Sequence, residues 1–226
     1  MSIFRRPEPP RHAARSRDQG PVAAVLAALA APLLPVAILA ASVASPHLHV
    51  DVGVIVEKHL TIVPIPTAEV LKEAADVWAP YGVIVAETTS RADPAATHDA
   101  VLWVDFSDRP ISAAADDYAW EMRLAGIRFS RQGTPSNHIV VYYAGAVRLA
   151  IMLGRRDQLE RRIAGRALAH EIGHYLLRTP GHAQEGLMLG IHRAADLANV
   201  DRSGFMLSAG DLNRLRALWL RNGGSE

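Results

Sequence analysis

The residues with the clearest chemical potential form one short motif, His170-Glu171-Ile172-Gly173-His174. On a helix, residues four positions apart lie almost one turn apart on the same side, so the imidazoles of His170 and His174 would face one point. Two neutral imidazole nitrogens at that spacing suit a zinc ion. Zinc lowers the pKa of a bound water to about 7, and the carboxylate of Glu171 can accept the proton of that water. The motif therefore predicts zinc-assisted hydrolysis with Glu171 as general base.

A catalytic zinc site takes three protein ligands and keeps one position open for water. Candidates for the third ligand follow the motif in the chain: His182, Glu185, His192 and Asp196. We favour His182 because it follows a Pro-Gly pair, where the chain can reverse toward the helix. The alternative is that His182 is an exposed loop histidine, and Glu185 is then the main competing ligand.

Residues 170–188, HEIGHYLLRTPGHAQEGLM, resemble the metzincin clan of zinc metallopeptidases. That clan carries an elongated H-E-x-x-H-x-x-G-x-x-H motif, followed by a turn with a methionine beneath the metal. The order of the strands and helices expected before the motif also resembles the clan. The resemblance implies hydrolysis of peptide bonds, with zinc on His170, His174 and His182, Glu171 as general base and Met188 as the turn methionine.

The chain departs from the clan's pattern at three positions. The clan's spacing would place the third histidine at Pro180 and the glycine at Leu177. His182 comes two residues later, which gives a variant H-E-x-x-H-x7-H arrangement that resembles a group of small exported bacterial proteins. Gly190 stands where the clan has a tyrosine close to the metal, so another donor must stabilise the transition state.

Two alternatives stay open at this point. Met188 follows His182 by only six residues and could be a simple core methionine, and Met206 is a second candidate for the turn. The zinc site could also be a structural or binding element of a non-catalytic cell-envelope protein. A fourth protein ligand would favour that role, whereas a carboxylate at Glu171 favours catalysis.

A helix must carry the motif, and the sequence indicates where this helix begins and ends. Asp157 followed by Glu160 resembles a capping box, which predicts a helix that runs to about Leu177. The segment 178–181, Arg-Thr-Pro-Gly, then ends it. Residues 181–207 show little periodicity and predict an ordered loop.

The remaining elements follow from short β-branched runs and from helical spacing of apolar residues. We expect strands at 50–57, 82–86, 100–106, 126–130 and 138–143, and helices at 66–79, at 144–153 and after a cap formed by Ser208 and Asp211. This order predicts an α/β (α+β) fold with a mixed, mostly parallel sheet covered by helices. Residues 126–130 are the expected sheet edge, to which a peptide could add as an extra strand.

The N-terminal region predicts a targeting or anchoring segment. Residues 1–20 form a basic flank with five arginines and two acidic residues, and residues 22–45 are almost entirely Ala, Val, Leu and Ile. A basic flank before an apolar run is typical of membrane insertion with the positive end in the cytoplasm. Residues 21–45 are therefore either a signal peptide cleaved near Ala44 or an uncleaved transmembrane anchor. Both interpretations place a metallopeptidase-like domain at 46–226 outside the cytoplasm, where it is secreted, periplasmic or membrane-anchored.

The amino-acid composition excludes several classes of protein and of metal site. The chain has 226 residues, a formal net charge of +1 and no cysteine. Disulfide scaffolds, thiolate zinc sites, iron–sulfur clusters and cysteine nucleophiles are thus excluded. Near-neutral charge gives no indication of a nucleic-acid partner. The expected partner is a peptide or protein substrate, with the membrane contacted through the N-terminal segment if that segment is not cleaved.

Overall fold

A computed structural model describes residues 48–57, 64–88, 98–107, 124–154 and 158–220, which all belong to one unit of the chain, Ala44–Glu226. The targeting segment predicted at 1–45 lies outside the described residues, as does nearly all of the segment between the third and fourth expected strands. Within the described ranges, no helix combines the length and apolarity that crossing a membrane requires.

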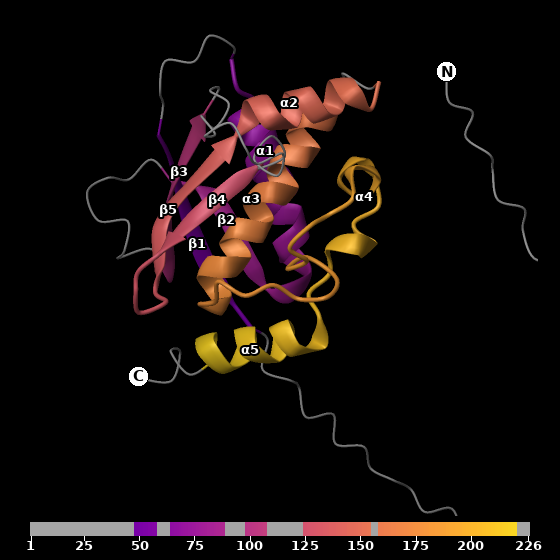
Figure 1. Cartoon of the computed structure of the whole chain (residues 1–226). Helices are drawn as coiled ribbons and strands as arrows, with labels where there is room; N and C mark the ends of the chain where they lie inside the picture. Colours follow the sequence, from indigo (N-terminus) through magenta and orange to yellow (C-terminus); the bar gives the residue numbers. More distant parts are fainter. Residues whose placement is uncertain (1–47, 58–63, 89–97, 108–123, 155–157, 221–226) are drawn as a thin grey trace, which may run out of the picture. The chain divides into compact units, whose positions relative to one another are not determined.

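Five strands form one sheet in the order β2-β1-β3-β5-β4 (Figure 1). Their bounds are Val50–Glu57 for β1, Val83–Glu87 for β2, Ala100–Ser107 for β3, Ala125–Phe129 for β4 and Pro135–Tyr142 for β5. Strands β2, β1, β3 and β5 pair in parallel, and β4 pairs antiparallel with β5 at one edge. The predicted α/β fold with a mixed, mostly parallel sheet is confirmed, and residues 126–129 of the expected edge lie in the edge strand β4.

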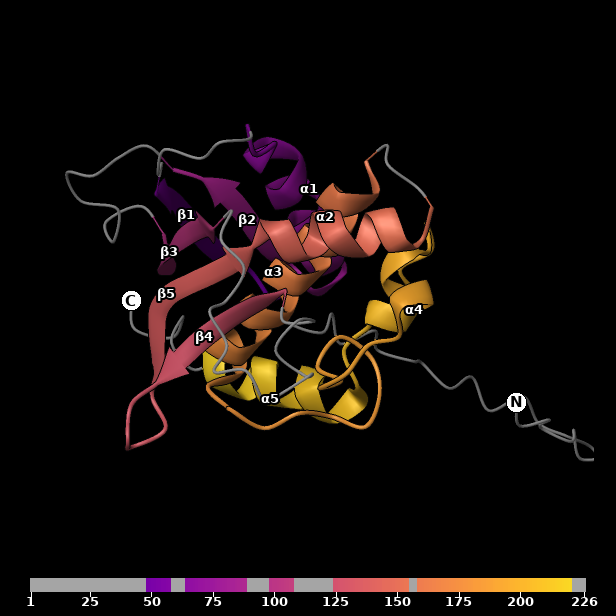
Figure 2. The same cartoon turned by 45° about the horizontal axis from the view of Figure 1, so that its top comes forward.

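Helices α1 (Thr67–Trp78) and α3 (Leu159–Leu177) lie together against one face of this sheet (Figures 1 and 2). Every second side chain of a strand points toward this face of the sheet. In β3, for example, Leu102 and Val104 are fully buried and their neighbours in sequence are half-buried. Burying an aliphatic side chain of this size contributes about 1.5–3 kcal/mol. The apolar face of the sheet therefore fixes where α3, and the motif on it, must lie.

The other helices complete the molecule: α2 spans Tyr143–Met152, α4 spans Ala194–Ala198 and α5 spans Ala209–Trp219, with 3-10 turns at Ala79–Tyr81 and Ser203–Phe205. The predicted cap of α5 is confirmed, since the Ser208 hydroxyl accepts a hydrogen bond from the backbone N–H of Asp211 at 3.1 Å.

The N-cap of α3 is Gln158, in the left-handed region at φ 62° and with no side-chain cap hydrogen bond. Asp157, the first residue of the predicted capping box, lies outside the described residues, so the box stays a prediction. One local expectation was wrong. The segment expected as loop at 181–207 contains α4, which is too short to show helical periodicity in sequence.

The close approach of α1 and α3 depends on Gly165. A Cβ at this position would lie 2.5 Å from the Cβ of Glu73 and 2.7 Å from the carbonyl oxygen of Val70. One turn further along, the indole N–H of Trp78 donates to the carbonyl oxygen of Ala169 at 3.0 Å. The two helices are therefore locked together immediately before His170.

We expect Gly165→Ala to lower the free energy of unfolding by about 1–2 kcal/mol, because the cost of overpacking exceeds the gain of roughly 1 kcal/mol in helix propensity. Gly126→Ala is the matched control, since a Cβ at Gly126 meets nothing within 4 Å. Urea unfolding measures both. Equal stability of the two variants would contradict the close α1–α3 contact.

Candidate metal centre

Three imidazoles converge at the C-terminal half of α3. His170 and His174 lie one turn apart on the helix, with ring centroids 4.7 Å apart. His182, from the loop that follows, places its ring centroid 5.3 Å from that of His170 and 4.9 Å from that of His174. One ligand nitrogen of each histidine lies within 4.8 Å of the other two. The structure thus brings together the three residues that the sequence proposed as metal ligands.

Two backbone carbonyls orient the helical pair. The Nδ1 atom of His170 lies 2.7 Å from the carbonyl oxygen of Leu187, and the Nδ1 atom of His174 lies 2.7 Å from that of Thr179. A carbonyl oxygen can only accept, so each Nδ1 carries the proton and donates it. Each Nε2 atom then keeps its lone pair for a metal ion.

Burial keeps these histidines neutral. Desolvation, with smaller contributions from the neighbouring rings of His174, His182 and His192, lowers the pKa of His170 to about 3, against the opposing effect of the hydrogen bond to the Leu187 carbonyl. Desolvation also lowers the pKa of His174, with a smaller contribution from His182. Because a histidine must be neutral to bind a metal, His170 and His174 are ready to do so at neutral pH.

The residues present fit a zinc ion with three protein ligands. Neutral imidazole is a preferred zinc donor, and the hydrogen bonds of two of the rings to carbonyls are the usual support of such ligands. His182 is exposed, which leaves the solvent side of the cluster accessible. Gly190 makes room for this third ring, since a Cβ there would lie 3.1 Å from its Cγ atom.

The competing ligands do not join this group, although the ring centroid of His192 lies 6.1 Å from that of His170. Glu185 is exposed in the loop, and Asp196 is exposed in α4. His192 stacks on Phe205 with centroids 4.6 Å apart, and its Nε2 lies 3.3 Å from the carbonyl oxygen of Leu187. Among the described residues, only the triad of His170, His174 and His182 forms a group able to hold a metal.

Glu171 and Met188 are both buried beside the triad residues. Glu171, the next residue after His170 on α3, is only 9% exposed. Met188 is 1% exposed and packs against Gly173, where a Cβ would collide with its sulfur atom. Met206 is instead 47% exposed. Met188 is therefore the methionine that packs against the motif helix, as the sequence predicted for a turn methionine, although its role in catalysis stays a prediction.

Hydrogen bonds between loop segments fix the turn that carries Met188. The N–H of Ala183 donates to the carbonyl oxygen of Met188 at 2.8 Å, and the N–H of Leu187 donates to that of Met206 at 2.8 Å. Gly186 adopts φ 73°, and a Cβ there would collide with the same carbonyl of Met206. These contacts fix the loop at Leu187, whose carbonyl oxygen accepts the hydrogen bond from His170.

Sequence reasoning missed several residues that shape the site. Gly173 lies inside the motif, where glycine lowers helix stability by about 1 kcal/mol relative to alanine. A glycine at such a position indicates that another group packs closely against the helix, which here is Met188. Arg166 lies one turn before His170 and is 1% exposed, which no periodicity argument would assign to an arginine. Phe129, the last residue of β4, packs its ring edge-on against His174 with centroids 6.0 Å apart. No sequence signal identified that contact, since it joins two distant segments.

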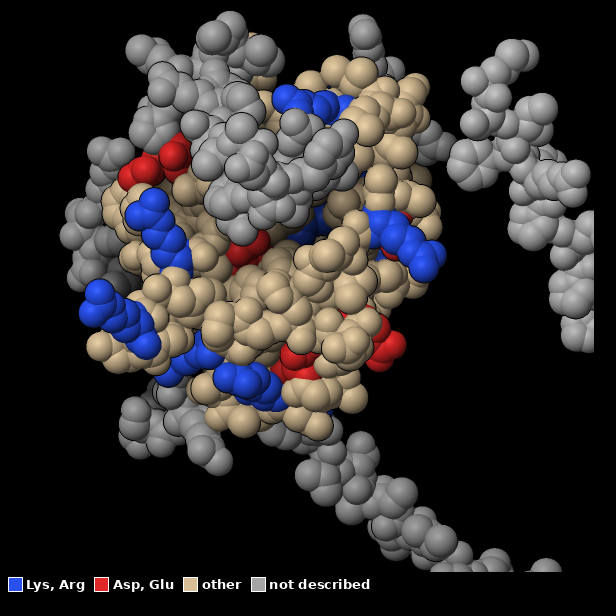
Figure 3. All heavy atoms as spheres, viewed as in Figure 1, with Lys and Arg blue, Asp and Glu red and all other residues tan. Residues whose placement is uncertain are grey.

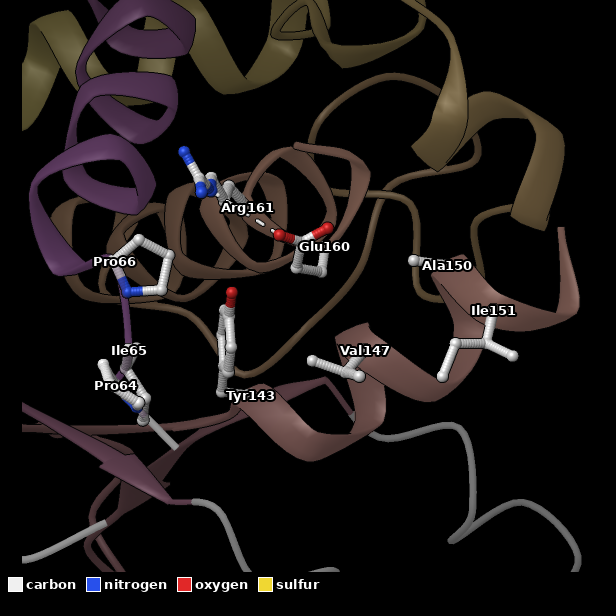
Figure 4. Close-up of a pocket in the computed structure, with 9 residues that line it drawn as sticks. All are labelled: Pro64, Ile65, Pro66, Tyr143, Val147, Ala150, Ile151, Glu160 and Arg161. Carbon is white, nitrogen blue, oxygen red and sulfur yellow. Dashed lines mark ion pairs between the residues drawn. The ribbon is translucent and has the colours of Figure 1, made fainter. Parts of the chain in front are cut away.

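A hollow of about 670 Å³ lies near the start of α3, at the other end of this helix from the triad (Figure 4). It is lined by Pro64, Ile65, Pro66, Tyr143, Val147, Ala150, Ile151, Glu160 and Arg161. Burial, followed by the charge of Glu160, raises the pKa of Tyr143 to about 12. None of the lining residues is a histidine, so the triad remains the candidate functional site.

Comparison with solved structures gives several matches. No family model matches the chain, and no curated protein matches its sequence. The crystal structure of archaemetzincin from Methanopyrus kandleri is similar with a TM-score of 0.46 and 16% identity, over 77% of this chain and 97% of that protein. We therefore infer function from the residues of the chain itself.

We expect the metal-free protein to lose stability as pH falls below about 6.5, the ordinary pKa of histidine. Burial lowers the pKa of His170 to about 3 and also lowers those of His174 and His192, so between these pH values the unfolded chain binds more protons than the folded one. Urea unfolding at pH 7.5, 6 and 5 measures this slope. His170→Gln should flatten it, and an unchanged slope in that variant would contradict the neutral state of His170.

Proposed function

We propose that the chain is a zinc-dependent metallopeptidase. The observation that carries the proposal is the convergence of three imidazole nitrogens, two of them turned toward one point by Nδ1 hydrogen bonds to carbonyls, next to a buried carboxylate at Glu171. The ligands would be His170, His174 and His182. When bound, zinc would polarise the carbonyl of a peptide bond and acidify the attacking water.

Glu171 would move the proton in this reaction. A carboxylate oxygen of Glu171 accepts a proton from the attacking water as the new C–O bond forms, and then donates it to the nitrogen of the leaving amine as the C–N bond breaks. Its position directly after His170 on α3 and its burial beside the triad residues support this role. The hydrogen bonds that His170 and His174 donate to backbone carbonyls would keep both rings in place while the substrate binds.

The edge strand β4 is the proposed place where a peptide substrate lies. Phe129 at the end of β4 contacts His174, so a peptide that adds to this edge as a further strand would pass beside the triad. Backbone hydrogen bonds along the edge would hold the peptide extended.

A structural zinc site is the alternative function. Structural sites are closed by four protein ligands, whereas the group found among the described residues has three members and an exposed third histidine. This difference supports catalysis. We also propose that the domain acts outside the cytoplasm, on the basis of the arginine-rich flank at 1–20 and the apolar run at 22–45.

Metal analysis of residues 46–226 together with a peptide hydrolysis assay tests the proposal. We expect about one zinc per chain in the wild-type domain. Glu171→Gln should retain zinc and lose roughly 10²–10⁴-fold in hydrolysis rate, because it lacks the general base. Glu185→Gln is the matched control, since Glu185 is an exposed carboxylate of the same loop, and its activity should equal that of the wild type.

His182→Ala tests the third ligand. Since His182 is exposed, this variant should fold normally and bind zinc more weakly than the wild type, as measured by competition with a chelator. Full zinc affinity in His182→Ala would refute only the assignment of the third ligand. A wild-type domain that binds no zinc would refute the whole proposal.

A further inference from the structure

The end of the site where β4 turns into β5 carries positive charge without matching acidic residues. Residues 124–142 contain Arg128 and Arg131 and no Asp or Glu, and residues 172–184 contain Arg178 and no Asp or Glu. All three arginines are exposed, and none forms an ion pair with a carboxylate of the described residues. In the space-filling view, basic side chains lie over the β4–β5 hairpin, and basic and acidic side chains lie together in the region of α5 (Figure 3).

A hollow of about 390 Å³ has one of these arginines, Arg178, in its wall. It is lined by Gly133, Thr134, Pro135, Tyr175, Arg178 and Trp219. Two of its lining residues link it to His174. Tyr175 directly follows His174 on α3, and Pro135 pairs with Phe129, whose ring contacts His174. A peptide held along β4 would therefore reach this hollow within a few residues of the triad.

The backbone of Arg178 is unusual. This residue ends α3 in the left-handed region at φ 48°, a position that glycine adopts without penalty and that costs other residues roughly 1–2 kcal/mol. The exposed guanidinium of Arg178 has no partner among the described residues to offset this cost. Backbone strain of this kind is common in residues that serve a binding site.

A second arginine reinforces the charge at this position. The Nε atom of Arg214, on α5, donates to the carbonyl oxygen of Leu177 at 2.7 Å, and its Nη2 donates to that of Arg178 at 3.3 Å. The guanidinium of Arg214 is therefore held at the end of α3. A bound anion at Arg178 would feel both positive charges.

The walls of the hollow fit the apolar stem of an acidic side chain. Tyr175 and Trp219 are both half-buried, and the indole N–H of Trp219 donates to the carbonyl oxygen of Leu176 at 3.0 Å, which fixes the ring. A guanidinium beside aromatic walls matches a carboxylate on a short methylene chain, because arginine binds carboxylates in a bidentate, charge-assisted manner.

We propose that Arg178 and this hollow form a subsite for a carboxylate of the substrate, so that the enzyme selects peptides with an acidic residue near the scissile bond. The inference rests on the proposed peptidase function and adds its substrate class. The carboxylate could belong to an Asp or Glu side chain or to the C-terminus of a short peptide, since both present the same group.

A binding experiment without turnover tests the subsite. The zinc-loaded Glu171→Gln domain is titrated with fluorescein-labelled peptides that differ only by Glu or Gln at single positions, and each peptide is made with a free or an amidated C-terminus. Fluorescence anisotropy should show about 10–100-fold tighter binding of the peptide that bears the recognised carboxylate. If replacement of Glu by Gln weakens binding, the recognised carboxylate belongs to a side chain. If amidation weakens binding, the recognised carboxylate is the C-terminus of the peptide.

Arg178→Asn, introduced in the same background, should abolish this preference. Asparagine tolerates the left-handed backbone, so the variant is expected to fold at least as well as the parent. Arg193→Asn is the matched control, because it removes the same charge from an exposed arginine at the start of α4, outside the hollow. It should leave the preference intact.

Equal binding of all the peptides, or a preference that survives Arg178→Asn, would overturn the subsite. If the wild-type domain hydrolyses peptides without regard to carboxylates, only the subsite is contradicted. If carboxylate binding depends on Arg178 but the wild-type domain hydrolyses no peptide, the peptidase proposal fails and the anion site stands.

Discussion

The hydrogen bonds from His170 and His174 to two backbone carbonyls are the interactions on which the rest of the site depends. They decide which nitrogen of each ring is free, and they tie the helix that carries the motif to the loop that follows it. Thr179 supplies its carbonyl just after α3 ends, so the left-handed end of the helix at Arg178 is needed to direct it back toward His174. Leu187 supplies the other from a turn that Gly186 makes possible.

The position of α3 depends in turn on a buried charge. Arg166 donates from Nε to Glu73 of α1 at 3.0 Å and from Nη1 to the carbonyl oxygen of Asp196 at 2.7 Å, and its guanidinium lies 4.5 Å from the centre of the Phe205 ring. Glu73 is also held by Arg202 at 2.6 Å. A buried pair of this kind contributes little net stability, but loss of one partner leaves an uncompensated charge and costs about 3–5 kcal/mol. Arg166 thus joins α1, α3 and the α4 segment one turn before the first ligand.

Much of the fold followed from local sequence patterns. Strand β1 was predicted with the bounds that the structure has, and the end of α3 at Leu177 agreed with its Pro-Gly stop signal, because alternation and chain punctuation are local properties. The presence of α4 did not follow, because a helix of five residues is too short to show a helical period in the sequence. In the site, the spacing of His170 and His174 indicated one face of a helix, and the Pro-Gly pair before His182 favoured that residue as the third ligand. The position of the His182 ring could not be derived. It depends on Gly190 and on the register of a loop stabilised by Met206, which no short motif encodes.

X-ray absorption at the zinc edge of the metal-loaded domain tests the central claim most directly, because it counts the ligand types around the ion. We predict that the zinc ion is bound by three imidazole nitrogens and one oxygen from solvent, and that His182→Ala loses one of the imidazoles. This prediction is contradicted by a site closed with a fourth protein ligand, or by fewer than three imidazoles in the wild-type domain.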